Sequence, residues 1–192
     1  MNCLIINASP NPRSNTQFLS LATKKLLEEE GLNAKVLNFE NYDLPLGSLG
    51  KLDEHKPSLF QKTLIENTSE ASVIFIFSPE YNWLPTPEII NLINLFAKKS
   101  NQSMFDNKVF ALAGVSSGRG GRTPALVLNQ MLNKVLSFLN FESVVSSKIF
   151  ESQFTQNCVD PSGKLLDNEG YNQGLKNYLD FTIKIANKWF NS

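Results

Sequence analysis

Three continuous apolar segments, residues 3–6, 73–77 and 109–113, stand out in an otherwise mixed pattern of apolar and polar positions. A strand in a parallel sheet is covered by helices on both faces, so it is apolar at nearly every position. These segments therefore predict three central strands. Residues 34–39 and 143–150 are more polar, and they predict two strands at the edges of the same sheet.

Segments with apolar residues at helical spacing lie between and after the predicted strands. The first ends before Gly31, a residue type that suits the position just beyond a helix, and a second is expected within residues 57–67. Two more helices are expected to begin at Thr-Pro pairs, with Thr86 and Thr123 as their N-caps. The fifth predicted helix lies near the C-terminus and carries Leu175, Tyr178, Leu179, Ile185 and Trp189.

Strands and helices alternate five times along residues 1–192, which predicts one α/β domain with a doubly wound parallel sheet. Because the second and fifth strands are the polar ones, the order 2-1-3-4-5 fits five strands better than orders that bury the second. The chain then reverses direction between the first and third strands, and ligands bind beyond the carboxyl ends of the strands at such a point. The loops after the first, third and fourth strands are therefore the candidates for a site.

The charge balance narrows the range of partners. The chain has 18 basic and 18 acidic residues, so neither a nucleic-acid-binding surface nor a strongly acidic one is indicated. The apolar runs are far shorter than the roughly 20 residues that span a bilayer. Cys3 and Cys158 match no metal-binding spacing and are expected to be buried thiols. We expect a cytoplasmic protein that binds neither nucleic acid nor membrane.

The first candidate loop, residues 8–16 (ASPNPRSNT), leads into a predicted helix. The free N–H groups and positive dipole end at a helix N-terminus suit an anion. Short polar side chains and one cation accompany them, namely Ser9, Arg13, Ser14, Asn15 and Thr16. The loop lacks G-x-G-x-x-G and the G-K-[ST] of a P-loop, so a phosphate monoester is favoured over a dinucleotide. The alternative is that Ser14, Asn15 or Thr16 only caps the helix.

The loops after the third and fourth predicted strands differ from ordinary turns. Residues 79–83 (PEYNW) place backbone polar groups and two aromatic rings where a flat heteroaromatic ligand is expected, although the rings are also common in cores and interfaces. Residues 116–122 (SSGRGGR) hold three glycines, which allow close approach of the backbone to a ligand or a flexible surface turn. Together the loops predict a site for a phosphate and a planar ring.

Residues that could perform acid–base chemistry are scarce. His55 is the only histidine and lies in a polar segment, so it is expected to be solvated. No Ser-His-Asp, Cys-His or metal-binding arrangement can be assembled from the sequence, and we predict no catalytic side chain and no metal site. A bound cofactor is therefore expected to carry the chemistry.

Residues 78–96 (SPEYNWLPTPEIINLINLF) resemble the P-E-Y-N segment and following helix of the NADPH-dependent FMN reductases. Residues 8–16 are similar to the phosphate loop of that family, G-S-x-R-x-x-S-x-N or S-P-R-x-x-S-N-T. Residues 116–122 are similar to its glycine-rich loop, and residues 43–46 (DLPL) to a D-L-P-hydrophobic turn. The resemblance covers most of the chain in order, and it is weakest after residue 150.

The resemblance implies a flavodoxin-like three-layer sandwich that binds FMN without a covalent bond. It also implies hydride transfer from NADPH or NADH through FMN to a flavin, quinone, azo compound or similar acceptor. A homodimer or homotetramer is the implied assembly. A second interpretation is an FMN-binding electron carrier or regulatory module without NAD(P)H turnover, and a third is a flavin-free relative used for protein contacts.

The resemblance also assigns binding residues by position and shows three departures. Ala8 replaces a usual glycine, Arg13 falls two positions later than the family's arginine, and Trp83 stands where the family has glycine. An indole at that place would cap the flavin, narrow the access of nicotinamide or contact a partner subunit. The implied FMN-binding residues are Ser9, Arg13, Ser14, Asn15, Thr16, Pro79, Glu80, Tyr81, Asn82, Trp83, Ser116, Ser117 and Gly118.

Overall fold

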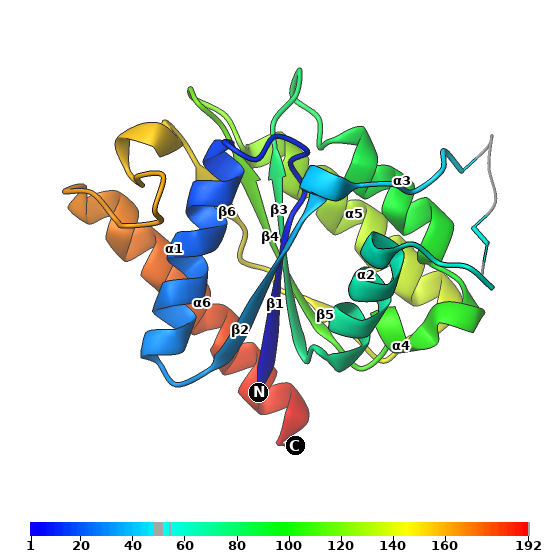
Figure 1. The fold of residues 1–192 in the computed structure, drawn as a ribbon. Coiled ribbons are helices and arrows are strands. Elements are labelled where there is room, and N and C mark those ends of the chain that lie inside the picture. The colour runs from blue at the N-terminus through cyan, green and yellow to red at the C-terminus, as the bar shows by residue number, and fades with distance from the viewer. Residues whose placement is uncertain (48–51, 54, 192) are drawn as a thin grey trace.

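The computed structural model describes residues 1–47, 52–53 and 55–191, which form a parallel sheet flanked by helices (Figure 1). The strand order is β2-β1-β3-β4-β5, with β6 also paired to β4, and every pairing is parallel. The predicted order is thus confirmed. The strands are β1 (Asn2–Asn7), β2 (Asn33–Asn38), β3 (Val73–Pro79), β4 (Val109–Val115), β5 (Val144–Val145) and β6 (Phe150–Ser152).

The helices cover both faces of the sheet and complete three layers (Figure 1). One face carries α1 (Asn15–Glu29) and α6 (Glu169–Phe190). The other carries α2 (Leu59–Glu70), α3 (Pro87–Phe96), the short α4 (Gln102–Phe105) and α5 (Arg122–Leu139). Three short 3-10 helices join these elements: η1 (Phe39–Asn41), η2 (Lys99–Asn101) and η3 (Thr155–Asn157).

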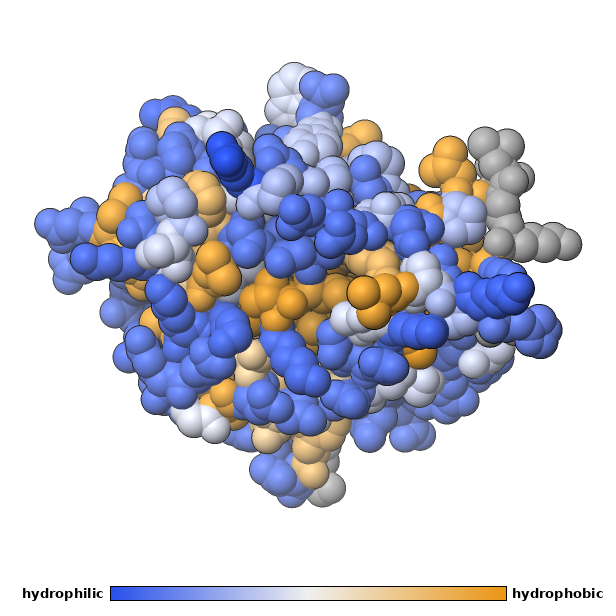
Figure 2. Space-filling model, in the orientation of Figure 1, coloured by the Kyte–Doolittle hydropathy of each residue, from blue (hydrophilic) through white to orange (hydrophobic). Residues whose placement is uncertain are grey.

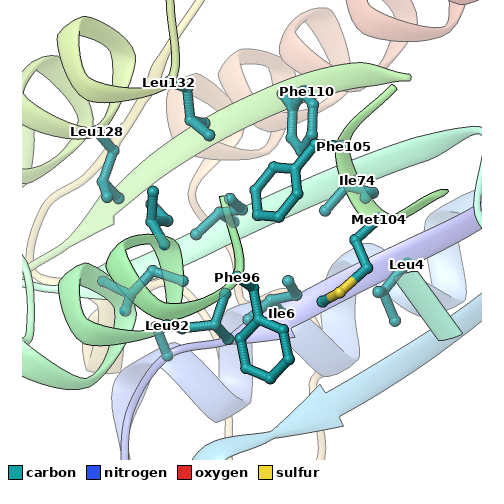
Figure 3. Packing of buried hydrophobic residues seen from close by; sticks show 14 of the residues in the cluster. Leu4, Ile6, Ile74, Leu92, Phe96, Met104, Phe105, Phe110, Leu128 and Leu132 are labelled. Atoms are coloured by element: carbon teal, nitrogen blue, oxygen red, sulfur yellow. The ribbon is translucent and has the colours of Figure 1, made fainter. Parts of the chain in front are cut away.

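The central strands are apolar throughout because alternate residues enter two different cores. In β1, Leu4 and Ile6 belong to the core beneath α3 and α5, whereas Cys3 and Ile5 belong to the core beneath α1 and α6. Figure 3 shows the first of these cores, where Leu92 and Phe96 of α3 and Leu128 and Leu132 of α5 lie over the sheet. Burial of both faces of the sheet thus explains the continuous apolar segments.

The last strand differs from the prediction of one strand over residues 143–150. Val145 pairs with Phe110, so an unbroken register would put Lys148 opposite Ala113. Phe150 occupies that place instead, because two additional residues lie between β5 and β6. The intervening segment leaves the sheet. The fifth predicted strand is therefore two short strands, β5 and β6, which both pair with β4, and the described residues form six strands in all.

Two predicted helix starts have different outcomes. Thr86 is the N-cap of α3, but its Oγ1 donates to the carbonyl of Ala8 at 2.9 Å instead of capping the helix. The N-cap of α5 is Gly121, at φ 91°, so the predicted cap at Thr123 is wrong. Thr123 lies inside the helix, since the chain begins to turn two residues earlier.

The helices of the described residues include no membrane-spanning segment. None of the helices within the described ranges is both long enough and apolar enough to cross a bilayer. Figure 2 shows a largely hydrophilic face with apolar side chains gathered near its middle.

Candidate functional site

A pocket of 310 Å³ lies where the loops after β1, β3 and β4 meet. These are the carboxyl ends of three adjacent strands, at the top of Figure 1. The structure therefore brings the three predicted loops to one place. The pocket is lined by Ser9, Asn11, Arg13, Ser14, Asn15, Thr16, Pro79, Glu80, Tyr81, Val115, Ser116 and Ser117.

The N-terminus of α1 forms one end of this pocket. Ser14 is the N-cap, and its Oγ accepts a bond of 3.1 Å from the N–H of Gln17, so this residue caps the helix as well as lining the pocket. Within the described chain, the N–H groups of Asn15 and Thr16 have no acceptor. The Oγ1 of Thr16 is also buried and has no hydrogen-bond partner there. Unpaired donors at a helix N-terminus are a favourable environment for an anion.

The loop before α1 is held by a ladder of side-chain to backbone bonds. The N–H of Ser9 donates to Asn7 Oδ1, that of Asn11 to Ser9 Oγ, and that of Arg13 to Asn11 Oδ1, at 3.2, 3.3 and 3.0 Å. Asn7 is buried and also donates to Gln17 and Asn38. Sequence reasoning missed Asn7 and Asn11, although polar residues at alternate positions 7, 9 and 11 are the signal of such Asx turns.

Arg13 brings a positive charge to the rim of the pocket. Its side chain is exposed and takes part in none of the ion pairs found in the described residues. The guanidinium is thus available to an anion, and phosphate is a ligand that arginine binds well.

Glu80 lines the pocket, but its carboxylate binds the neighbouring loop. Oε2 accepts a bond of 2.6 Å from the N–H of Gly121. A Cβ at Gly120 would meet the same carboxylate, so a larger residue there would displace it from this position. The backbone N–H of Glu80 donates to the carbonyl of Val115 at 2.9 Å. Glu80 therefore ties the loop after β3 to the loop after β4.

Residues 81–84 form a two-residue hairpin that projects beyond β3 (Figure 1). Tyr81 and Leu84 exchange two backbone bonds of 3.0 and 3.1 Å. Asn82 and Trp83 between them have φ of 49° and 65°, the pattern of a type I′ turn. Glycine suits the second position best, and Trp83 occupies it with 71% of its surface exposed. The indole points to solvent and does not line the pocket.

The loop after β4 closes on itself. A side chain at Gly114, the sixth residue of β4, would collide with the carbonyl of Gly121 at the start of α5. Gly121 itself has φ 91°, which disfavours other residues. Of the three glycines predicted to allow close backbone approach to a ligand, Gly121 thus permits approach between two parts of the chain.

The pocket contains ten of the thirteen residues assigned from the sequence. Asn82, Trp83 and Gly118 are not among the residues that line it, although each belongs to a loop that does. His55 is exposed and is not in the pocket. The described residues contain no group of three His, Cys, Asp or Glu side chains arranged to bind a metal ion.

A second hollow of 950 Å³ lies between α1 and α6 and is lined by the side chains of these helices and of the turn after α1. Its apolar lining residues are Leu26, Leu27, Leu32, Leu179 and Ile183. It is remote from the carboxyl ends of the strands and contains none of the residues assigned from the sequence. We therefore place the candidate site in the smaller pocket.

The fold and the pocket define a flavodoxin-like α/β protein in which the N-terminus of α1, with its unpaired donors, lies beside a loop-lined cavity. The family model for NADPH-dependent FMN reductases matches residues 1–151. The chain therefore belongs to the NADPH-dependent FMN reductase family. Among curated proteins, none matches the chain significantly.

Several solved structures share the fold at low sequence identity. FerB, a flavoenzyme NAD(P)H:(acceptor) oxidoreductase from Paracoccus denitrificans, is 17% identical over 97% of each chain, with a TM-score of 0.73. RosB, solved with 8-demethyl-8-formylriboflavin-5'-phosphate, is 17% identical over 100% of this chain and 81% of its own, with a TM-score of 0.69. A flavodoxin from the domain Archaea is 14% identical over 98% of this chain and 99% of its own, with a TM-score of 0.59.

Proposed function

We propose that the protein is an FMN-dependent oxidoreductase that oxidises NADPH or NADH and reduces a small acceptor such as a flavin, a quinone or an azo compound. Family membership supports the flavin, and the pocket at the carboxyl ends of β1, β3 and β4 supports its location.

One observation carries the proposal: the buried hydroxyl of Thr16 has no partner at the N-terminus of α1. A buried hydroxyl without a hydrogen bond costs stability, and a ligand in the pocket would satisfy the one at Thr16. The free N–H groups of Asn15 and Thr16 lie beside it, and Arg13 adds charge at the rim. This donor set fits a phosphate monoester, as in FMN.

The rest of the pocket fits a planar ring. Pro79, Tyr81, Ser116 and Ser117 line it with backbone polar groups and one aromatic face. Glu80 would act by holding the loop that contains Ser116 and Ser117, because its carboxylate is bound to Gly121. We propose that Asn82, Trp83 and Gly118 contribute through the shape of their loops.

When bound, FMN supplies the redox chemistry, since it accepts a hydride from nicotinamide and passes electrons to an acceptor. The protein's part is to bind and orient the ring, and to place N–H donors where negative charge develops on reduction. No side chain in the pocket needs to transfer a proton, and solvent reaches the pocket directly.

We also propose that the protein forms a homodimer or homotetramer through the surface around the hairpin. Tyr81, Trp83 and Leu84 expose 45%, 71% and 53% of their surfaces there. Adjacent exposed apolar side chains on a projecting turn favour a protein contact. Light scattering on the purified protein measures the mass and tests this assembly.

The function is tested by absorption spectroscopy of the purified protein with added FMN, before and after anaerobic addition of NADPH or NADH. Bound FMN that bleaches with either nucleotide and is reoxidised by a quinone would support the reductase. FMN that binds without bleaching would support the carrier or regulatory interpretation. Failure to bind FMN would reject both.

A further inference from the structure

Residues 154–156 bind three consecutive carbonyl groups of the loop after β4. The N–H of Phe154 donates to the carbonyl of Gly118 at 3.1 Å. Thr155 donates its N–H to the carbonyl of Ser116 at 3.2 Å, and its Oγ1 lies 3.1 Å from the same carbonyl and 3.1 Å from that of Ser152. The Nε2 of Gln156 donates to the carbonyl of Ser117 at 3.0 Å. One short segment thus fixes one side of this loop.

This arrangement determines where the loop N–H groups point. In a trans peptide the C=O of one residue and the N–H of the next point in opposite directions. The bond from Thr155 to the Ser116 carbonyl therefore turns the N–H of Ser117 away from residues 154–156. That N–H has no acceptor in the described part of the chain, and Ser117 lines the pocket. The next N–H, of Gly118, is bound by Ser116 Oγ at 3.2 Å.

Gln156 joins this loop to the N-terminus of α1. Its Oε1 accepts a bond of 3.0 Å from Asn15 Nδ2, while its Nε2 donates to the carbonyl of Ser117. Asn15 is the first residue of α1 and lines the opposite end of the pocket. One side-chain amide therefore fixes the spacing between the helix end and the loop.

A buried hydroxyl network holds Thr155 in place. Thr155 is 0% exposed, and its Oγ1 lies 2.6 Å from the Oγ of Ser152. The Oγ of Ser152 lies at the same distance, 2.6 Å, from the phenol of Tyr171 in α6. Burial raises the pKa of Tyr171 above its usual range, so the phenol stays neutral and keeps its proton for this network. The contact from the loop thus continues into the rigid helix α6.

We propose that Thr155 and Gln156 are positioning residues that aim the Ser117 N–H at the bound ring and set its distance from the phosphate end. Both lie beyond residues 1–151, the part that matches the family. The inference rests on the proposed FMN site. An N–H aimed at the ring stabilises negative charge, so these residues favour binding of reduced FMN over oxidised FMN.

The test measures dissociation constants for oxidised and reduced FMN, the latter from the midpoint potential of the bound flavin. Thr155→Val removes the hydroxyl and keeps the volume, and we expect a loss of roughly fivefold for oxidised and tenfold or more for reduced FMN. Thr155→Ser should restore both values. Gln156→Ala should weaken both by roughly twofold to fivefold because its bonds are exposed. Gln153→Ala is the matched control, since its exposed side chain has no hydrogen bond among the described residues.

The outcomes separate this inference from the proposed function. Wild-type protein that binds FMN, together with Thr155→Val and Gln156→Ala variants of unchanged affinity and potential, would overturn the positioning role alone. A loss in Gln153→Ala as large as in Gln156→Ala would also overturn it. Failure of the wild-type protein to bind FMN would overturn both proposals. Gln156 is exposed, so its variant is expected to fold even where Thr155→Val is destabilised.

Discussion

The carboxylate of Glu80 accepts a hydrogen bond of 2.6 Å from the N–H of Gly121, and this bond joins the loops that follow β3 and β4. Glu80 was expected to line the ring of a bound flavin. Its carboxylate is bonded to the loop that carries Ser116 and Ser117, and the residue also lines the pocket. We propose that Glu80 supports binding by holding this loop, a role that substitution can separate from direct contact.

Replacing Glu80 should distinguish the hydrogen bond from the charge. Glu80→Ala leaves the N–H of Gly121 without an acceptor, so we expect a loss of about 1–3 kcal/mol in the free energy of unfolding. Glu80→Gln keeps an acceptor oxygen and should lose less than half as much. Urea denaturation measures both, with the exposed Glu66→Ala as control. Equal losses in the Ala and Gln variants would show that the negative charge matters more than the bond.

The two unpartnered threonines of α1 provide a matched pair. Thr16 and Thr23 are both buried with hydroxyls that lack a partner, but only Thr16 lines the pocket. Valine at either position removes an unsatisfied group, so the unliganded protein should be unchanged or up to about 1 kcal/mol more stable. Thr16→Val alone should weaken FMN binding, by roughly tenfold.

Riboflavin, which lacks the phosphate, provides the control for that experiment. Its affinity should be the same for the wild-type protein and for Thr16→Val, as measured by fluorescence titration. An equal loss of FMN and riboflavin affinity would mean that Thr16 does not contact the phosphate. A loss in Thr23→Val would point to a general effect on α1.

The hairpin at residues 81–84 should become more stable with glycine at its second turn position. Trp83 has φ 65°, and a left-handed conformation costs a residue with a Cβ roughly 1–2 kcal/mol. We expect Trp83→Gly to be about 1 kcal/mol more stable than Trp83→Ala, which keeps the Cβ. Thermal and urea unfolding of the two variants give this difference. Equal stabilities would mean that the turn relaxes without strain.

The stability should fall at high pH because of Cys3. Burial raises the pKa of this thiol from 9.0 to about 11, against an opposing effect of the N-terminal charge. The folded state then retains a proton that the unfolded state releases between pH 9 and 11. The stabilisation is complete below pH 9 and is lost as the pH rises to 11, by an amount on the order of 2–3 kcal/mol.

Cys3→Ala isolates this contribution, because other buried groups titrate in both proteins. The difference in the free energy of unfolding between wild type and variant should shrink from pH 9 to pH 11 in the presence of a reducing agent. A constant difference across this range would contradict a raised pKa. The variant also removes the thiol's packing, which shifts the difference at every pH equally.

The sheet was predictable because a strand that is buried on both faces is apolar at nearly every position of its sequence. The apolar segments at residues 3–6, 73–77 and 109–113 lie in β1, β3 and β4, and the order followed from the polarity of the edges. The split into β5 and β6 was not predictable, since two additional residues between them do not change the composition of the segment. The start of α5 was missed because Gly121 caps it through its backbone conformation alone.

The location of the candidate site was predictable from the sequence, but the contacts within it were not. The topology alone brings the loops after β1, β3 and β4 together, so most assigned residues line one pocket. The direction of each side chain depends on distant partners. Nothing near Glu80 in the sequence points to Gly121, and nothing near Gln156 points to Asn15. Such contacts appear only when the loops are folded.

The close approach of Gly114 and Gly121 joins the two ends of the loop after β4. The end of β4 and the start of α5 are in contact there, since a Cβ at Gly114 would overlap the carbonyl of Gly121. Both glycines therefore have to be kept when the loop is redesigned. Arg119 lies between these glycines and is exposed, so a substitution there has little structural cost. Exchanging this one residue therefore alters the exposed surface of the loop and leaves its bonds to residues 154–156 and to Glu80 in place.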